Sequence, residues 1–467
     1  MKVLLVNPPA KYTILGNNPA IIDEGRGLNP PIGLLYAAAG VRGHDLSVLD
    51  AQDMDYVELR SRLAAAAPAV VGITTMTFTL VDVAETVRAA REVCPGCRVV
   101  LGGIHTHLYP RESLDLPGVD YLLVGEGERS FPLLLDAIAL GREPREIPGV
   151  AYRKDGEIRF TPPALIDDLD SLPFPARELL PVGRYSSVVA RRNPVSIMVT
   201  SRGCPFQCIF CNRPHLGKRW RARSSENVVA ELRECKALGI GEVLFYDDTF
   251  NIDRKRVVAI CNAILKEKLD IAWDIRARVD LVDEEMLRTL REAGCQRIHF
   301  GVEASSDESL RTLRKGYTIE QVKIAFELSR RVGIETLAYF MIGIPGEGRR
   351  EAERTIEFAA RLGADYAHIT ILTPFPGTEL YRMALERGLY REDYWLEFAR
   401  RPSPDFRPRY WDEQLSGEEL EELVREAYRR FYLRPGYALK RLLRTRSVGE
   451  LSRKLKGGLR VLRMRRR

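Results

Sequence analysis

Short apolar runs alternate with amphipathic segments along most of the chain. In residues 1–140 the apolar runs are 2–7, 46–50, 69–75, 98–103 and 121–125, and helical patterns such as 33–41 and 79–93 lie between them. This alternation predicts a doubly wound parallel sheet. The runs end in polar or glycine-rich turns, where open α/β sheets bind ligands. Residues 1–140 are therefore predicted to form a Rossmann-like ligand-binding domain.

A second series of the same kind follows in residues 191–375. Its apolar runs are 195–201, 242–247, 271–279, 297–303, 335–345 and 367–374, and its helical patterns include 224–238, 284–293, 319–332 and 350–362. About six β/α units predict a partial (β/α)6 barrel resembling part of a TIM barrel, with its chemistry at the carboxyl ends of the strands. The fold class predicted for the whole chain is α/β.

The remaining segments are less regular. Residues 141–190 are rich in proline and predict a linker, in which 149–161 has the pattern of a small hairpin with an Asp-Gly turn. Residues 376–435 are predicted to form an aromatic and helical extension, whose aromatic stretch 390–412 suggests an apolar substrate pocket. Its last helix starts at a capping box formed by Ser416 and Glu419. Residues 436–467 form a basic amphipathic tail.

Composition is that of an ordinary globular protein. Of 467 residues, 45% are hydrophobic and 29% charged. The sequence contains no run of ~18 apolar residues, so no membrane span is predicted. The short apolar run in MKVLLVNPP is typical of a buried strand rather than of a signal peptide. The eight cysteines do not have the pattern of a disulfide framework. We therefore expect a cytoplasmic protein.

Three of the cysteines are clustered in the segment SRGCPFQCIFCN at 201–212. Soft thiolates select zinc, copper(I) or iron–sulfur clusters. Structural zinc takes four ligands, usually in two close pairs, and no second pair follows here, although a zinc knuckle is the alternative. A [4Fe–4S] cluster held by only three thiolates keeps one iron open for a small chelating molecule.

The motif C-x3-C-x2-C after the first strand of a β/α barrel resembles the radical S-adenosylmethionine (SAM) enzymes. The resemblance implies that Cys204, Cys208 and Cys211 bind the cluster and that Phe210 is the aromatic residue before the third cysteine. It also implies that the open iron binds SAM and that an electron, supplied by a reductant such as flavodoxin or ferredoxin, cleaves SAM to a 5′-deoxyadenosyl radical.

Later strand ends resemble further motifs of these enzymes. The resemblance implies contacts with SAM or the substrate from polar and glycine residues in FYDD, IRARVD, FGVEA and MIGIPGE. These residues are Asp247, Arg278, Glu303, Gly343 and Gly346. The segment TPFPGTELY at 373–381 is similar to one in the cobalamin-binding branch of the superfamily.

The first domain resembles the cobalamin-binding domains that are fused to such barrels. The implied cobalamin site lies at strand ends, at Thr74, Thr75, Gly102, Gly103, His105, Gly125 and Glu126. None of the six histidines lies in the pattern Asp-x-His-x-x-Gly, so the lower face of cobalt is expected to have no histidine ligand. A domain that has kept the fold and lost the ligand, and a generic nucleotide-binding domain, are the alternatives.

The other cysteines have simpler interpretations. Cys94 and Cys97 have the C-x-x-C spacing of a redox pair, but the proline and glycine between them predict a surface turn. The three cysteines on apolar faces are predicted to be packing residues. They are Cys235, Cys261 and Cys295.

Charge is concentrated at the end of the chain. Residues 434–467 hold 13 Lys or Arg and one acid, which leaves a net charge of −5 on the rest. A basic amphipathic tail favours peripheral contact with a membrane surface. A solubilising tail is an equal alternative, and nucleic acid is the weaker one because no RNA-binding module accompanies the tail.

Together these resemblances imply a cobalamin-dependent radical SAM enzyme, and we expect it to methylate an unactivated carbon of an apolar lipid, isoprenoid or tetrapyrrole-like substrate. The chain also resembles anaerobic magnesium-protoporphyrin monomethyl ester cyclases and hopanoid-modifying enzymes, so an oxidative cyclase is the alternative. A non-catalytic cobalamin or redox sensor is an alternative of another class. A methylthiotransferase would need a second three-cysteine cluster in the first domain, where only Cys94 and Cys97 occur.

Overall fold

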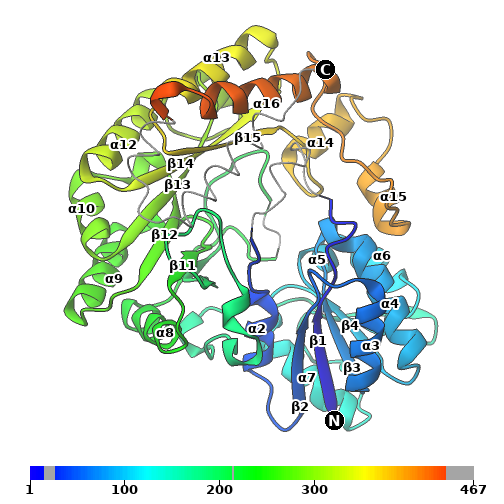
Figure 1. The fold of residues 1–467 in the computed structure, drawn as a ribbon. Coiled ribbons are helices and arrows are strands. Elements are labelled where there is room, and N and C mark those ends of the chain that lie inside the picture. Colours follow the sequence, from blue (N-terminus) through cyan, green and yellow to red (C-terminus); the bar gives the residue numbers. More distant parts are fainter. Residues whose placement is uncertain (15–26, 213–214, 438–467) are drawn as a thin grey trace.

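The computed structural model describes residues 1–14, 27–212 and 215–437, which form two α/β bodies (Figure 1). The first body contains a seven-stranded sheet in the order β2-β1-β3-β4-β5-β6-β7. Its strands are β1 (Lys2–Asn7), β2 (Asp45–Asp50), β3 (Val70–Thr74), β4 (Arg98–Gly102), β5 (Tyr121–Leu123), β6 (Val150–Lys154) and β7 (Glu157–Phe160). The first five pair in parallel, as predicted. Their order places a topological switch point between β1 and β3, where such sheets bind ligands.

Helices cover both faces of this sheet. They are α2 (Ile32–Ala39), α3 (Tyr56–Ala66), α4 (Leu80–Val93), α5 (Ile104–Leu108), α6 (Pro110–Asp115) and α7 (Gly127–Ala139). Because side chains alternate along a strand, Val3 and Leu5 of β1 belong to the core beneath α2 and α7. Leu4 and Val6 belong to the core beneath α3 and α4. The apolar runs of the sequence are continuous because these strands are buried on both faces.

The hairpin predicted in the linker forms, but it belongs to the first sheet. Strands β6 and β7 pair antiparallel around a turn at Asp155 and Gly156. Strand β6 also pairs antiparallel with β5, so the hairpin extends the edge of the sheet. The turn chemistry predicted the hairpin, whereas its docking partner was set by the exposed edge of β5, whose backbone groups need hydrogen bonds.

The second body is an open barrel of six parallel strands in the order β15-β14-β13-β12-β11-β8, as predicted. The strands are β8 (Val195–Met198), β11 (Glu242–Phe245), β12 (Ala272–Ala277), β13 (Cys295–Glu303), β14 (Glu335–Ile342) and β15 (Tyr366–Ile371). Outside them lie α8 (Ser225–Ala237), α9 (Arg254–Lys266), α10 (Glu284–Glu292), α11 (Asp307–Thr312), α12 (Ile319–Val332) and α13 (Arg349–Arg361). A short ribbon of β9 (Ser201–Arg202) and β10 (Arg221–Ala222) follows β8.

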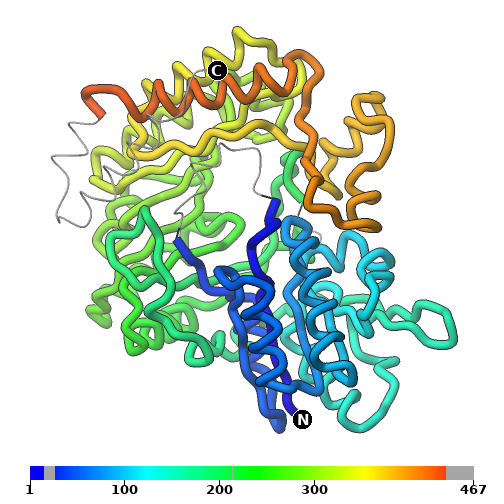
Figure 2. The backbone as a smooth tube through the Cα atoms, turned by 45° about the vertical axis from the view of Figure 1, so that its right-hand side comes forward, coloured from blue at the N-terminus to red at the C-terminus, as the bar shows by residue number. Residues whose placement is uncertain are grey.

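The C-terminal extension covers one end of the barrel and reaches the first body. It contains α14 (Glu379–Glu386), α15 (Tyr394–Arg400) and α16 (Gly417–Tyr432). The capping box predicted at the start of α16 is present. Helix α16 packs on α13 and β15, while α15 packs on α6 of the first body (Figure 2). The basic tail predicted at 436–467 lies, beyond Tyr437, outside the described residues.

The cysteines outside the cluster motif are packing residues. Cys235, Cys261 and Cys295 are buried, as predicted. Cys94 and Cys97 flank a turn, with the Cys97 N–H donating to the Cys94 carbonyl at 3.0 Å. However, both thiols are buried, and burial raises the pKa of each. Within the described residues, no helix is long and apolar enough to cross a bilayer.

Candidate functional site

The three-cysteine loop starts from a tightly closed base at the carboxyl end of the barrel. Strands β9 and β10 pair antiparallel and bring the two ends of the loop together. Gly203 has a φ of +83°, and a Cβ there would lie 2.3 Å from the carbonyl oxygen of Arg219. Only glycine fits this close approach. The chain therefore enters Cys204 in a direction that the ribbon fixes.

The middle of the loop is held by the barrel and by the C-terminal extension. The Ile209 N–H donates to the Leu313 carbonyl at 3.3 Å, and the Ile209 carbonyl accepts from the Leu380 N–H at 2.9 Å. Ile209 itself is buried. The Cys211 N–H donates to the Cys208 carbonyl at 3.2 Å, which closes a turn between these two cysteines. Residues 208–211 are thus held by backbone hydrogen bonds and by the buried Ile209 side chain.

The thiols lie partly open at the same end of the barrel. Cys204 and Cys208 are half-buried and Cys211 is exposed. Among the described residues, no three His, Cys, Asp or Glu side chains converge closely enough to chelate a single metal ion. The thiolates of an iron–sulfur cluster bind different iron atoms, so they need not converge on one point. Three partly exposed thiols therefore fit a cluster that keeps one iron open.

A buried ion pair lies beside Cys208. Lys315 Nζ is 2.9 Å from Glu303 Oε1, and both side chains are buried. Burial opposes the charge on Lys315, but Glu303 outweighs it and the pKa of Lys315 is raised. Burial also raises the pKa of the Cys208 thiol, while Lys315 and Arg278 oppose this shift. The positive charges thus favour the thiolate form that binds iron.

Lys315 was not predicted from the sequence. It lies in RKGY, a segment that looks like a charged surface turn, and its ammonium lies 5.5 Å from the centre of the Phe210 ring. Glu303 has a φ of +69°, which places it in the left-handed region that non-glycine residues rarely adopt. Such an outlier at the end of a barrel strand is typical of a functional position.

Arg278 holds the first part of the cysteine loop. Its guanidinium carbon lies 3.6 Å from the centre of the Phe206 ring, between Cys204 and Cys208 in sequence. Its Nε and Nη2 donate to the two carboxylate oxygens of Asp280 at 2.9 and 3.0 Å. In this structure Arg278 therefore positions the loop, and its contact with the SAM carboxylate stays a prediction.

Asp247 also supports the segment before the cysteines. Its carboxylate accepts from the backbone N–H and the hydroxyl of Thr200, and from the hydroxyl of Ser201, each at 2.6 Å. Asp247 is buried. Both oxygens order the entry to the loop, and the predicted contact with the SAM amino group stays a prediction.

The two predicted glycines of the fifth barrel strand differ in their surroundings. Gly343 has a φ of +84°, and a Cβ there would lie 2.9 Å from Leu420 of α16. Gly346 has the same φ, but a Cβ there would meet nothing within 4 Å. Gly343 thus lets α16 pack closely, whereas Gly346 leaves open space. Their predicted contacts with SAM stay predictions.

In the first body, three predicted residues form a packed strand end. Gly103 has a φ of +128°, and a Cβ there would lie 2.6 Å from the Thr75 carbonyl oxygen. The His105 N–H donates to that same carbonyl at 3.2 Å. The His105 ring is fully buried, with Nδ1 3.1 Å from Thr77 Oγ1 and Nε2 without a partner. Burial lowers the pKa of His105 to about 3, so the imidazole is neutral.

Thr74, Gly102 and Gly125 remain partly accessible at the carboxyl ends of their strands. A Cβ at Gly125, whose φ is +90°, would lie 2.9 Å from Pro163. The half-exposed strand ends and the orphaned His105 nitrogen fit a ligand at the carboxyl edge of the sheet. These residues therefore fit a cobalamin site, which would hold the ligand against β3, β4 and the turn after β5.

Glu126 has a different role from the predicted contact with cobalamin. Its Oε1 is 2.8 Å from Arg202 Nη1, and its Oε2 is 2.8 Å from Arg221 Nη1. The backbone N–H of Ile166 donates to Oε2 at 2.5 Å. All of these groups are buried, so the carboxylate is saturated by contacts within the protein. Glu126 ties the first body to both strands of the ribbon at the base of the cysteine loop.

The two bodies also meet directly beside the cysteine loop. Phe78, after β3, packs edge-on against Phe375, after β15, with ring centres 5.3 Å apart. Asn212 donates a hydrogen bond to the Gly377 carbonyl. A Cβ at Gly377 would lie 2.7 Å from Leu108 of α5. The carboxyl ends of the strands in the sheet and in the barrel therefore face each other.

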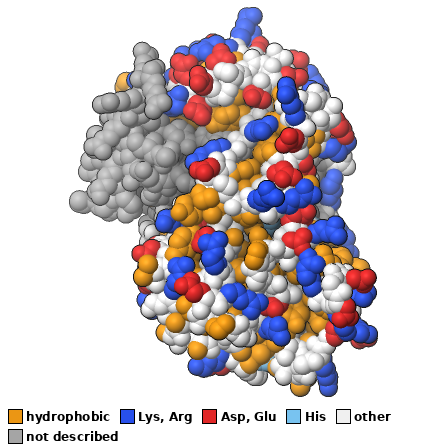
Figure 3. All heavy atoms as spheres, turned by 90° about the vertical axis from the view of Figure 1, so that its right-hand side faces the viewer, with side chains coloured by type: hydrophobic (Ala, Val, Ile, Leu, Met, Phe, Trp, Pro, Cys, Tyr) orange, Lys and Arg blue, Asp and Glu red, His pale blue; other side chains and the backbone are white. Residues whose placement is uncertain are grey.

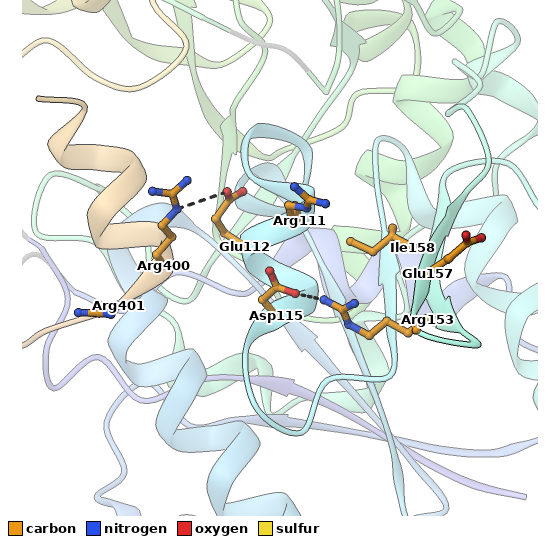
Figure 4. Close-up of a pocket in the computed structure, with 9 residues that line it drawn as sticks. Arg111, Glu112, Asp115, Arg153, Glu157, Ile158, Arg400 and Arg401 are labelled. Carbon is orange, nitrogen blue, oxygen red and sulfur yellow. Dashed lines mark hydrogen bonds and ion pairs between the residues drawn. The ribbon is translucent and has the colours of Figure 1, made fainter.

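A separate cavity of about 790 Å³ lies between α6, the β6–β7 hairpin and α15. Figure 4 shows charged side chains of both signs around it, with dashed interactions joining Arg400 to Glu112 and Arg153 to Asp115. No residue predicted to bind a cofactor lines it. None of the three cysteines lines it either, so the cavity is distinct from the cysteine site.

Comparison with known proteins agrees with both halves of the chain. Residues 198–359 match the radical SAM superfamily, and residues 19–135 match the B12 binding domain. The chain is 36% identical to an uncharacterized methyltransferase of Pyrococcus horikoshii, over 99% of this chain and 98% of that protein. It is 31% identical to the anaerobic magnesium-protoporphyrin IX monomethyl ester cyclase of Rubrivivax gelatinosus, over 87% of this chain and 74% of that protein.

A solved structure has the same fold. The radical SAM methyltransferase TsrM of Kitasatospora setae, with tryptophan and a SAM analogue bound, superposes with a TM-score of 0.68. The match covers 83% of this chain and 76% of TsrM at 21% identity. At that identity the similarity concerns the fold, an α/β domain joined to a partial barrel.

Proposed function

Because the chain belongs to the cobalamin-binding family of radical SAM enzymes, we propose that it methylates an unactivated carbon atom of a small molecule. It is an enzyme whose cofactors are a [4Fe–4S] cluster, SAM and cobalamin. When bound, these groups supply hydrogen-atom abstraction and the methyl group. The chain's own residues hold them, orient them and exclude water from the space between them.

The observation that carries this proposal is the meeting of the two ligand-binding ends. The cysteine loop is fixed to the first body through Glu126, Arg202 and Arg221. The strand-end turns of the sheet and the barrel touch at Phe78 and Phe375. A substrate between them would contact both halves, and such proximity replaces an encounter of separate molecules.

Two residues beside the cysteines support cluster binding. Lys315 and Arg278 place positive charge near Cys208, which favours its thiolate. Phe206 is clamped under Arg278, so the segment between the first two cysteines cannot swing freely. These contacts preorganise the loop before any cluster is bound.

The apolar substrate was predicted partly from the aromatic stretch 390–412. In the structure these rings pack against one another: Trp395 lies 4.9 Å and Phe398 4.0 Å from Phe406, between ring centres. Tyr390 and Tyr394 are buried as well. The stretch forms the core of the extension, so it does not support an apolar pocket. A lipid, isoprenoid or tetrapyrrole-like substrate stays a prediction.

The oxidative cyclase is the second candidate, and the identity with the Rubrivivax enzyme favours it. The sensor, in contrast, has no need of three partly open thiols at a barrel mouth. Figure 3 shows a face of the molecule on which basic and acidic side chains are interspersed. Such a mixed surface does not favour a nucleic-acid substrate, which binds to clustered basic side chains. The reductant and the membrane contact of the basic tail remain predictions.

The test uses the reconstituted holoenzyme under anaerobic conditions. Cys204→Ala, Cys208→Ala and Cys211→Ala should each abolish formation of 5′-deoxyadenosine from SAM, whereas Cys261→Ala, in a buried packing position, should retain it. SAM carrying a deuterated methyl group is then supplied together with host extract. Transfer of the label to a new product supports methylation. A new product without label that has gained oxygen or lost hydrogen supports the cyclase, and 5′-deoxyadenosine from a cysteine variant contradicts the cluster assignment.

A further inference from the structure

The inner face of the barrel carries polar side chains, some of which are partly exposed, and this bears on the class of substrate. Phe300 of β13 packs on Phe326 of α12, and Phe340 of β14 packs on Phe358 of α13. Because strand side chains alternate, their neighbours on each strand face the barrel interior. In β15 the accessible and buried positions also alternate. The outward side chains are covered by helices, whereas Arg276, Tyr339 and the inward side chains of β15 are partly exposed.

A hydrogen-bonded row of three inward side chains crosses this interior. His299 Nε2 lies 3.2 Å from Asp274 Oδ2, and His299 Nδ1 lies 3.0 Å from the Tyr339 hydroxyl. Asp274 accepts only, so Nε2 carries the proton and Nδ1 accepts from the tyrosine O–H. The phenolic oxygen of Tyr339 is thereby left with its acceptor positions facing the interior.

Arg276 lies next to this row, on β12 opposite His299. Its guanidinium carbon is 3.5 Å from the centre of the Tyr246 ring, and its Nη1 donates to the Phe245 carbonyl at 2.8 Å. Within the described part of the chain no carboxylate forms an ion pair with Arg276. The second oxygen of Asp274, fully buried, also has no hydrogen-bond partner.

The charged side chains nearer the amino ends of the barrel strands are already paired with one another. Arg297 Nη2 is 3.2 Å from Glu242 Oε1 and 4.0 Å from Asp274 Oδ2, and Arg297 also donates to the Val189 carbonyl. These groups close the floor of the barrel. Among the inward-facing arginines described in β12 and β13, Arg297 is paired, whereas Arg276, nearer the carboxyl ends of the strands, forms no ion pair with a carboxylate.

We propose that Arg276 forms a substrate subsite that binds an anionic oxygen group, a carboxylate or a phosphorus oxyacid, and that Tyr339 holds an adjacent donor group of the same ligand. The Arg276 guanidinium supplies the charge-assisted donors that such groups prefer, and Tyr339 accepts from a neighbouring donor on the ligand. His299 and Asp274 position the Tyr339 hydroxyl. The inference rests on the proposed function, and it replaces a wholly apolar substrate by one with a polar anionic end.

The first test separates substrates by charge. Holoenzyme, SAM with a deuterated methyl group and host extract fractionated by anion exchange are combined, and labelled products are identified by mass. We expect the label in material retained by the column. With that fraction, Arg276→Gln should raise KM roughly 10- to 100-fold, because a hydrogen bond to a charged group is lost. Tyr339→Phe should raise it roughly 2- to 10-fold, and the exposed control Arg288→Gln should not.

Three readouts make the outcome decisive. The variants should keep the cluster and cobalamin absorption spectra and the slow cleavage of SAM without substrate. A labelled product only in the unretained neutral fraction would overturn the inference. So would loss of substrate-free SAM cleavage in Arg276→Gln, since Arg276 would then serve SAM.

A binding measurement separates this inference from the proposed function. Methylphosphonate should raise the thermal unfolding midpoint of the wild-type holoenzyme and of Arg288→Gln, and not that of Arg276→Gln. If no fraction of the extract accepts the label, methylation is refuted, while the difference between the two arginine variants still decides the anion subsite. An equal response of both variants would overturn it.

Discussion

Replacing Glu126 by Gln should loosen the base of the cysteine loop. The carboxylate is 1% exposed and lies 2.8 Å from both Arg202 and Arg221. Burial opposes its ionisation, but the two arginines outweigh burial and lower its pKa. The amide of Gln has the same size but no charge, so it leaves Arg221 buried without a carboxylate. Arg202 keeps its second partner, Glu128.

The magnitude follows from the cost of breaking a buried ion pair. Removing one partner costs ~3–5 kcal/mol because the other charge stays buried and unpaired. A tenfold change in an equilibrium corresponds to ~1.4 kcal/mol. Amide hydrogens at the ends of the β9–β10 ribbon, such as that of Arg223, which follows β10 and donates to the Thr200 carbonyl, should therefore exchange roughly 10²- to 10⁴-fold faster. Iron content after reconstitution should fall as well.

Hydrogen exchange followed by mass spectrometry reads this effect locally, so it does not require two-state unfolding of a two-body protein. The control is Glu284→Gln, whose pairs with Arg288 and Arg331 are exposed and contribute ~0–1 kcal/mol. The double variant Glu126→Leu/Arg221→Met should exchange more slowly than Glu126→Gln, because it leaves fewer unpaired charges. Equal exchange in Glu126→Gln and in the control would refute the coupling.

Three further predictions concern other parts of the chain. Gly103→Ala should lower the thermal midpoint because its Cβ would lie 2.6 Å from the Thr75 carbonyl, whereas Gly96→Ala, with open space around it, should not. The pKa of His105 is about 3, below ~6.5 in the unfolded chain. The contribution of neutral His105 to the free energy of unfolding should therefore be fully present above pH ~6.5 and should be lost as the pH drops toward 3, by up to ~1.4 kcal/mol per pH unit. In urea titrations, His105→Gln should reduce this dependence on pH. Removal of 438–467 should abolish co-sedimentation with anionic vesicles, and unchanged sedimentation would contradict a membrane role of the tail.

The fold was predictable because its signals are local. Buried parallel strands such as 2–7 are continuous apolar runs, and each is followed by a helical period. The cysteine motif is similarly compact, so its place after the first barrel strand could be inferred from spacing alone. The turn at 155–156 predicted a hairpin, but no local signal states which sheet edge a hairpin joins.

The chemistry around the cysteines was less predictable because burial decides it. Lys315 in RKGY resembles a solvated residue, and only the fold brings it to Glu303, twelve positions earlier in the chain. Glu126 followed a strand and was interpreted as a ligand contact, yet its partners lie at 202 and 221. Likewise, composition shows that 390–412 is aromatic and does not show whether its rings face a pocket or one another.

The cysteine loop is a short segment of the sequence, but the contacts that hold it come from distant parts of the chain. Ile209 is held by Leu313 and Leu380, and the ribbon below it is held by Glu126 of the other body. Each anchor comes from a different segment, so the geometry of the three thiols depends on the first domain, the barrel and the extension together. Noncovalent contacts from these three parts of the chain are therefore what align the two ligand-binding ends. It also implies that a barrel excised from the chain would retain the motif and lose its orientation.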